Sequence, residues 1–89
     1  MSGLDAVPRL RRGVRTAYDG TRAGHVVLFP EGVLVLNETA AAVVGLCDGR
    51  TSVGGIARLL AERFDGVRVG DVVRLVDRLA ARRVVDVGG

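Results

Sequence analysis

Residues 25–48, HVVLFPEGVLVLNETAAAVVGLCD, constrain the fold of this chain most strongly, because they predict a β-hairpin that runs directly into a helix. Two short apolar runs, His25–Phe29 and Val33–Leu36, flank the sequence Pro30-Glu31-Gly32. Proline presets the φ angle at the first corner of a turn, and glycine tolerates the positive φ that closes it. An antiparallel pair of strands is therefore expected to precede the first helix without a linker.

The first helix is predicted over Ala40–Cys47. Either Asn37 or Thr39 can accept a hydrogen bond from a backbone N–H of its first turn. Glu38 lies favourably at the positive end of the helix dipole. Asp48-Gly49 ends the helix, because glycine readily adopts the conformation that follows a helix C-terminus.

The second strand of the hairpin is apolar on both of its faces. Side chains alternate between the two faces of a strand, so the four apolar residues Val33–Leu36 cannot all point into one core. A chain of 89 residues cannot cover both faces of a sheet well. We therefore expect either a deeply wrapped hairpin or an apolar strand edge that awaits a partner.

Length and composition indicate one small globular domain. A chain of 89 residues buries about 60–65% of its unfolded surface, which is enough for a single core. Aromatic residues make up 3% of the chain, so the core must be built from Val, Leu and Ala. The formal net charge of +3 fits acidic partners, and equally a merely soluble protein. No signal peptide or membrane-spanning apolar run is visible, so we expect a cytoplasmic protein.

The N-terminal part of the chain predicts one more strand. Residues 1–7 are expected to form a flexible terminus ahead of a single domain over residues 8–87. Arg9–Tyr18 alternates partly between apolar and other residues, which predicts one irregular strand with a kink at Gly13. The turn-forming residues 19–24 return the chain to the hairpin, so three strands follow one another in antiparallel order.

Two further helices and a short strand are predicted in the C-terminal half. Thr51 or Ser52 can cap the second helix, which carries an apolar stripe. Asp71 is predicted to cap the third helix after a connector over Val67–Gly70, and Val84–Val87 is typical of a last short strand. A three-stranded antiparallel sheet followed by a three-helix bundle indicates an α+β domain of the winged helix-turn-helix type.

The sequence carries little catalytic equipment. His25 lies in a predicted strand without a partner at a catalytic spacing, and Cys47 is typical of a buried small hydrophobic residue. Asp71 and Asp77 are six residues apart on a helix and do not share a face, so they predict no acid–base pair. One histidine and one cysteine provide no metal-ligand spacing. We expect a protein that is not an enzyme and that holds no metal or cofactor.

Arg74, Arg78 and Arg82 form an i, i+4, i+8 series along the third helix. Such a series can bind DNA phosphates, as a recognition helix does, or it can flank a groove that takes an acidic peptide. It can also be a solvated face that Asp71 and Asp77 partly neutralise. Base recognition needs suitable polar side chains near the helix start, which is acidic and apolar here, so nucleic acid is disfavoured.

Two segments, Leu36-Asn37-Glu38-Thr39-Ala40 and Leu46-Cys47-Asp48-Gly49, are distinctive. They follow RLRRGVR at residues 9–15 and HVVLFPEG at residues 25–32. Together with the helices that come after them, these segments resemble the PqqD family of pyrroloquinoline quinone (PQQ) biosynthesis. The resemblance covers residues 8–87, which is nearly the whole chain.

The resemblance implies a peptide chaperone and no catalytic activity. Members of the family bind the precursor peptide PqqA and present it to the radical S-adenosylmethionine enzyme PqqE, which cross-links a glutamate and a tyrosine of the peptide. The resemblance also implies the winged-helix fold of a recognition element for ribosomally synthesised and post-translationally modified peptides (RiPPs). In that fold the leader peptide adds as a strand to the edge of the sheet, beside the third helix.

The peptide-binding residues expected on this basis come from the edge strand and from the third helix. The strand supplies the edge and one wall, apolar helix residues supply the other wall, and the arginines meet acidic side chains of the peptide. The predicted set is Val33, Leu34, Val35, Leu36, Val72, Arg74, Leu75, Arg78, Leu79 and Arg82.

Other interpretations stay open at this point. The domain can be a recognition element for a different ribosomal peptide pathway. It can also be a small winged-helix DNA-binding protein, whose affinity would fall steeply with salt. An exposed apolar strand additionally permits a homodimer through strand pairing or swapping.

Overall fold

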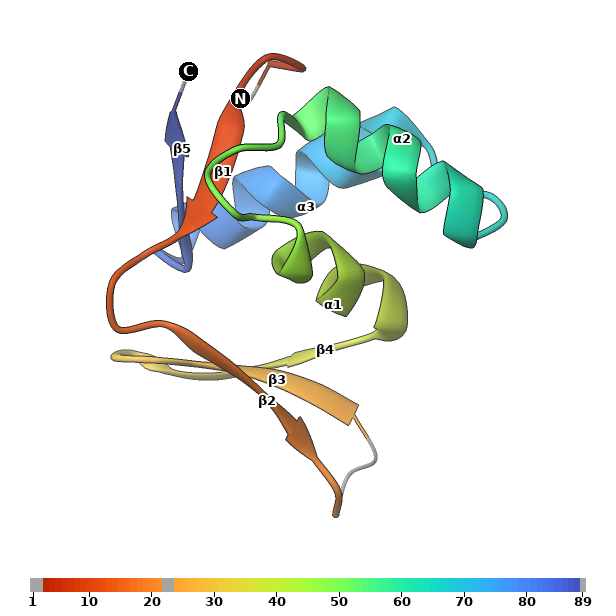
Figure 1. Ribbon diagram of the computed structural model, residues 1–89. Helices are drawn as coiled ribbons and strands as arrows, with labels where there is room; N and C mark the ends of the chain where they lie inside the picture. Colours follow the sequence, from red (N-terminus) through yellow and green to blue (C-terminus); the bar gives the residue numbers. More distant parts are fainter. Residues whose placement is uncertain (1–2, 22–23, 89) are drawn as a thin grey trace.

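The computed structural model describes residues 3–21 and 24–88, and in these residues two small antiparallel sheets accompany three helices (Figure 1). The elements in chain order are β1 (Val7–Leu10), β2 (Arg15–Asp19), β3 (Gly24–Phe29), β4 (Gly32–Leu36), α1 (Glu38–Gly45), α2 (Val53–Arg63), α3 (Val69–Ala81) and β5 (Val85–Gly88). Within the described residues, no helix has both the length and the apolar character needed to cross a membrane.

The larger sheet has the strand order β2-β3-β4, and both of its pairings are antiparallel. Phe29 pairs with Gly32 across the two-residue turn Pro30-Glu31, and Gly32 has a φ of 151° that favours glycine. This confirms the predicted hairpin and its turn. The three helices follow the sheet, so the prediction of an α+β domain with a three-stranded sheet and three helices is confirmed.

The predicted single strand over Arg9–Tyr18 is wrong, because the segment forms two strands that belong to different sheets. β1 pairs with β5, whereas β2 pairs with β3. Gly13 has a φ of 86° in the turn between them, and Val14 N–H donates to Arg11 O at 3.1 Å. The chain therefore turns at Gly13 instead of continuing through a kink. The predicted last strand is present, one residue later than expected, as β5.

The segment before β1 contacts the start of α2. Ala6 O accepts a hydrogen bond from Val53 N–H at 2.8 Å, and Leu4 O accepts one from Gly54 N–H at 3.0 Å. Val7 already belongs to β1, so regular structure begins one residue before the expected domain boundary. Met1 and Ser2 lie outside the described residues. The predicted flexibility of residues 1–7 stays a prediction.

Each helix begins at an identifiable cap, and the third begins earlier than predicted. Asn37 Oδ1 accepts from Ala40 N–H at 2.7 Å at the start of α1, and Ser52 Oγ accepts from Gly55 N–H at 3.1 Å at the start of α2. The expected connector over Val67–Gly70 is wrong, because α3 begins at Val69. Asp71 is the third residue of that helix and reaches back to accept from Arg68 N–H at 3.3 Å.

The core lies between the three helices and one face of the larger sheet (Figure 1). Its most deeply buried members are small aliphatic residues, as the low aromatic content requires: Val27, Val43, Val44, Val53, Ile56, Leu60, Val72, Val76, Leu79, Val84 and Val85. The opposite face of the sheet carries no helix. Val33 and Val35 of β4 are each 55% exposed there. β4 is therefore apolar both on the face that meets the core and on the face that meets solvent.

Cys47 is buried, as predicted, and its burial makes the folded state less stable as the pH becomes alkaline. The side chain is 4% exposed, and Sγ lies 3.2 Å from Val43 O. Burial, with a smaller contribution from the Asp48 carboxylate, raises the pKa of this thiol from 9.0 to about 11. The folded state therefore keeps the proton in a pH range where the unfolded state loses it.

We predict that the free energy of unfolding falls as the pH rises from 9 towards 11, by at most about 1.4 kcal/mol per unit from this thiol. The contribution is fully present below pH 9. Urea titrations between pH 8 and 10.5 measure the slope, with Cys47→Ala as the control that loses it. Equal slopes in the two proteins would show that the thiol is not protected.

Candidate functional site

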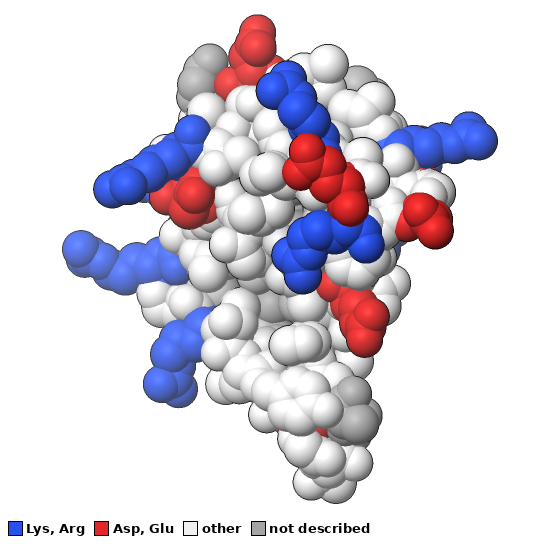
Figure 2. Space-filling view, turned by 45° about the vertical axis from the view of Figure 1, so that its right-hand side comes forward, with Lys and Arg blue, Asp and Glu red and all other residues white. Residues whose placement is uncertain are grey.

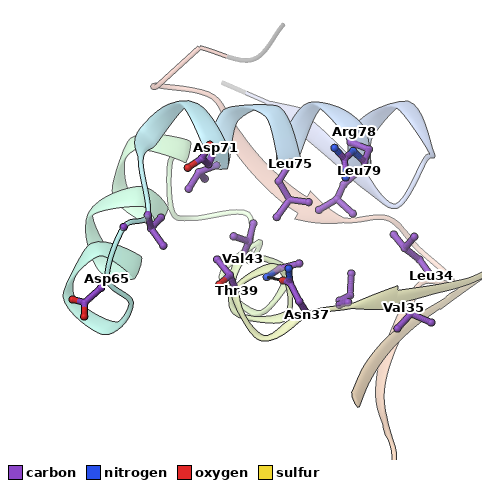
Figure 3. A pocket seen from close by; sticks show the side chains of 15 residues that line it. Leu34, Val35, Asn37, Thr39, Val43, Asp65, Asp71, Leu75, Arg78 and Leu79 are labelled. Carbon is purple, nitrogen blue, oxygen red and sulfur yellow. Dashed lines mark hydrogen bonds between the residues drawn. The ribbon is translucent and has the colours of Figure 1, made fainter. Parts of the chain in front are cut away.

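An open groove of about 470 Å³ lies between β4 and α3 (Figure 3). Two further segments complete it, namely α1 with the residue before it and the turn between α2 and α3. The residues that line it are Leu34, Val35, Leu36, Asn37, Thr39, Ala40, Val43, Asp65, Gly66, Val67, Asp71, Val72, Leu75, Arg78 and Leu79. The groove therefore follows an exposed strand instead of closing over a compact ligand.

The walls of the groove are mainly aliphatic. Leu34 and Leu75 are half-buried and point into the groove from opposite walls, which are β4 and α3 (Figure 3). Leu36, Val43 and Leu79 are almost fully buried and form its base. Leu34 and Leu75 therefore keep part of their apolar surface in water, and a ligand that covers them gains about 25 cal/mol for each Å² removed from water.

β4 is an edge strand, because it pairs with β3 and with no other described strand. The pair that closes a two-residue turn is hydrogen-bonded, and hydrogen-bonded pairs alternate with non-hydrogen-bonded pairs along an antiparallel ladder. Counting from the Phe29–Gly32 pair, Val33 and Val35 occupy non-hydrogen-bonded positions. Their N–H and C=O groups therefore point away from β3, towards the open edge beside the groove.

Charged side chains stand at the two ends of the groove. Arg78 lies at the end that contains Leu34, and Asp65 lies at the opposite end (Figure 3). Asp71 also lines the groove, but its carboxylate accepts hydrogen bonds from the Arg74 guanidinium and from Arg68 N–H. On the face of the molecule in Figure 2, charged side chains gather over the helical part, whereas the sheet below it is almost uncharged.

The groove brings together seven of the ten residues predicted from the sequence. These are Leu34, Val35, Leu36, Val72, Leu75, Arg78 and Leu79. Val33 does not line the groove, and its side chain is exposed on the outer face of the sheet. Its main chain nevertheless contributes to the open edge. The assignment of these residues to peptide binding stays a prediction.

The three arginines of the predicted series, two in α3 and Arg82 directly after it, do not share one wall. Arg78 lines the groove, Arg74 forms an ion pair with Asp71, and the Arg82 guanidinium carbon lies 6.0 Å from the centroid of the Phe29 ring. An α-helix turns by about 100° per residue, so each step of four residues drifts by about 40° around the helix. Over eight residues the drift separates the two outer arginines, and the series does not form a straight phosphate-binding stripe.

Sequence reasoning missed two segments that border the groove. The first turn of α1 contributes Asn37, Thr39 and Ala40, and the turn between α2 and α3 contributes Asp65-Gly66 and Val67. The first segment was predicted as a helix start and Val67 as part of a connector, so neither segment was expected to contact a ligand. The two segments lie at one end of the cleft because β4 and α3 run in opposite directions, and the sequence alone does not reveal that relation.

The described residues contain no group of three or more His, Cys, Asp or Glu side chains arranged to hold a metal ion. Asp71, which was considered for an acid–base pair, instead stabilises the start of α3. The site presents main-chain groups, aliphatic surface and one charge at either end. Those are the elements that recognise an extended polypeptide by strand addition.

The family of the chain follows from comparison with known proteins. The family Coenzyme PQQ synthesis protein D (PqqD) matches residues 24–85, which include the hairpin, all three helices and the groove. The chain belongs to the PqqD family. The resemblance seen in the sequence is thus confirmed.

Related proteins support the same assignment. A PqqA binding protein of Pseudomonas aeruginosa is 43% identical over 67 residues, which are 75% of this chain and 73% of that protein. A PqqA binding protein of Kluyvera intermedia is 44% identical over 71 residues, which are 79% of this chain and 77% of that protein. The bifunctional coenzyme PQQ synthesis protein C/D of Methylorubrum extorquens is 41% identical over 88 residues, and the match spans 96% of this chain and 23% of the bifunctional protein.

A solved structure has the same fold. The solution NMR structure of the PqqD truncation of Methylobacterium extorquens PqqCD superimposes with a TM-score of 0.76 and is 40% identical. The match covers 90% of this PqqD chain and 88% of that one. That truncation is described as a functional and stand-alone RiPP recognition element. The α+β recognition-element fold expected from the sequence is therefore the fold of a PqqD relative.

Proposed function

We propose that this PqqD protein binds a PqqA-type precursor peptide in the groove between β4 and α3 and presents it to a PqqE-type radical S-adenosylmethionine enzyme. The observation that carries the proposal is the open edge of β4 beside a half-exposed aliphatic wall. The names of the P. aeruginosa and K. intermedia relatives support PqqA as the peptide.

In this mechanism the peptide becomes a fourth strand of the sheet. Its main chain exchanges hydrogen bonds with the outward groups of Val33 and Val35, which gives affinity with little dependence on sequence. Alternate side chains then point into the groove, where Leu34 and Leu75 provide the apolar contacts and supply selectivity. The remaining side chains point away from α3, where an enzyme can reach them.

The proposal gives the chain a binding role and leaves bond formation to the enzyme. Holding the leader segment as a strand restricts its conformations before it meets the enzyme, which reduces the entropy that the second encounter must overcome. Because the precursor is made by ribosomes, the proposal puts the complex in the cytoplasm. A second copy of the chain can compete for the same β4 edge, so the proposal makes self-pairing and peptide binding mutually exclusive.

The test is a fluorescence anisotropy titration of a labelled PqqA-type precursor peptide with the purified protein, at 50 and 300 mM salt. We expect saturable binding whose affinity falls by less than about tenfold between the two salt concentrations, because strand pairing and apolar contacts contribute much of it. A labelled DNA duplex serves as the control. Absence of peptide binding by the folded protein, or tighter and steeply salt-dependent binding of the duplex, would refute the proposal.

A further inference from the structure

We propose that the groove reads the direction of its peptide, selecting a segment with a basic residue on its N-terminal side and an acidic residue on its C-terminal side. This inference rests on the proposed function and adds a class of sequence to it. The observation behind it is the opposite charge of the two ends of the groove, where Asp65 and Arg78 stand (Figure 3).

Both charges are available to a ligand. Among residues 3–21 and 24–88, no ion pair involves Asp65 or Arg78, and both residues are exposed. Asp71 lies at the same end as Asp65, but the Arg74 guanidinium and the backbone N–H of Arg68 already bind its carboxylate. That carboxylate also occupies the positive end of the α3 dipole, which would otherwise attract an acidic residue of the peptide.

The direction of β4 determines which end of the peptide meets which charge. β4 runs from Gly32 to Leu36, and its Leu34 lies near Arg78, while the chain continues through Asn37 towards the Asp65 end (Figure 3). Antiparallel pairing is more stable per residue than parallel pairing and continues the pattern of this sheet. A peptide that pairs in this way begins near Asp65 and ends near Arg78.

The spacing of the charges limits the segment further. Asp71 and Arg78 are seven residues apart on α3, which corresponds to about 10 Å along the helix axis. Asp65 lies beyond Asp71, on the side away from Arg78 (Figure 3), so a peptide that meets both charges must span more than this length. Four strand residues span about 13 Å, and an even spacing places both side chains on the face that points into the groove. The shortest pattern that satisfies both conditions is basic-x-apolar-x-acidic, and this is the pattern that we propose.

Two synthetic peptides of eleven residues test the direction. Both have a threonine background with valine at position 6; one carries lysine at position 4 and glutamate at position 8, and the other has the two charges exchanged. We expect the wild-type protein to bind the lysine-first peptide at least about fivefold more tightly, as two exposed ion pairs allow. In the double variant Asp65→Lys, Arg78→Glu, the preference should reverse.

The matched control is the double variant Arg58→Glu, Glu62→Lys, which exchanges charges on an exposed part of α2 outside the groove and should keep the wild-type preference. Equal affinity of the wild-type protein for the two peptides, or binding of neither, would overturn the inference about direction. The PqqA-type precursor is titrated with the same protein samples. If the precursor also fails to bind, the proposed function is refuted. If the precursor binds, only the inference about the direction of the peptide is refuted.

Discussion

The variant Val35→Pro should lose affinity for the precursor peptide by at least about thirtyfold while it remains folded. Proline removes the N–H that Val35 directs at the open edge, which costs about 1 kcal/mol for the missing hydrogen bond, and its ring keeps a fourth strand at a distance. The fold tolerates the change, because proline is accepted on an edge strand when its nitrogen faces outward.

The control for this variant is Val35→Thr, which keeps the N–H and nearly the same side-chain shape. Its affinity for the precursor should stay within about threefold of the wild type, because the N–H is kept and the shape of the half-exposed side chain hardly changes. Circular dichroism establishes that both variants are folded. Unchanged affinity in folded Val35→Pro would show that the peptide does not pair with β4.

Leu60→Ala should have the largest effect on stability. Leu60 has no exposed surface and lies in the core cluster between the helices and the sheet. Removing its three outer carbon atoms leaves a cavity and lowers the free energy of unfolding by about 2–5 kcal/mol. For a domain of this size, each 1 kcal/mol corresponds to about 4–8 °C, so the melting temperature should fall by more than about 8 °C.

The neighbouring Leu59 offers a matched control on the same helix. Its side chain is 41% exposed, so Leu59→Ala should change the free energy of unfolding by no more than about 0.5 kcal/mol. Urea denaturation of both variants measures the difference. Similar losses in the two proteins would contradict the orientation of α2 and the position of the core.

Local patterns predicted the hairpin and the helices well. Pro30-Glu31-Gly32 forces a turn wherever it lies in the fold, and Asn37 and Ser52 cap helices through bonds that span only three residues. The start of α3 was misplaced because an aspartate serves equally well at the cap and at the third helical position. Asp71 takes the second role, with a backbone N–H of Arg68 as its partner.

The second sheet could not be predicted from local patterns. β1 and β5 each have four residues, and their pairing joins positions more than seventy residues apart. Neither strand shows a strong alternation, so nothing in either segment identifies its partner. The ion pair between Arg11 and Asp86, at 2.8 Å, marks this contact, but two charges so far apart in sequence do not predict one another.

The groove could be predicted in part from one physical conflict. Four consecutive apolar residues in β4 cannot all be buried by one layer of helices, and this indicated the exposed strand. The apolar wall on α3 followed from helical periodicity. The positions of Arg74 and Arg82 could not be predicted in this way. They depend on how far the helix face turns between the two residues and on the contacts with Asp71 and Phe29.

Backbone amide NMR of the labelled protein, recorded during titration with the precursor peptide, tests whether the peptide adds to the edge of β4. We expect saturable shifts in β4 and on the groove side of α3, with slowed amide exchange at Val33 and Val35. β1 and β5 should stay unchanged, because they lie outside the groove. Shifts confined to other elements, or fast exchange at Val33 and Val35 in the saturated complex, would contradict the addition of the peptide to this edge.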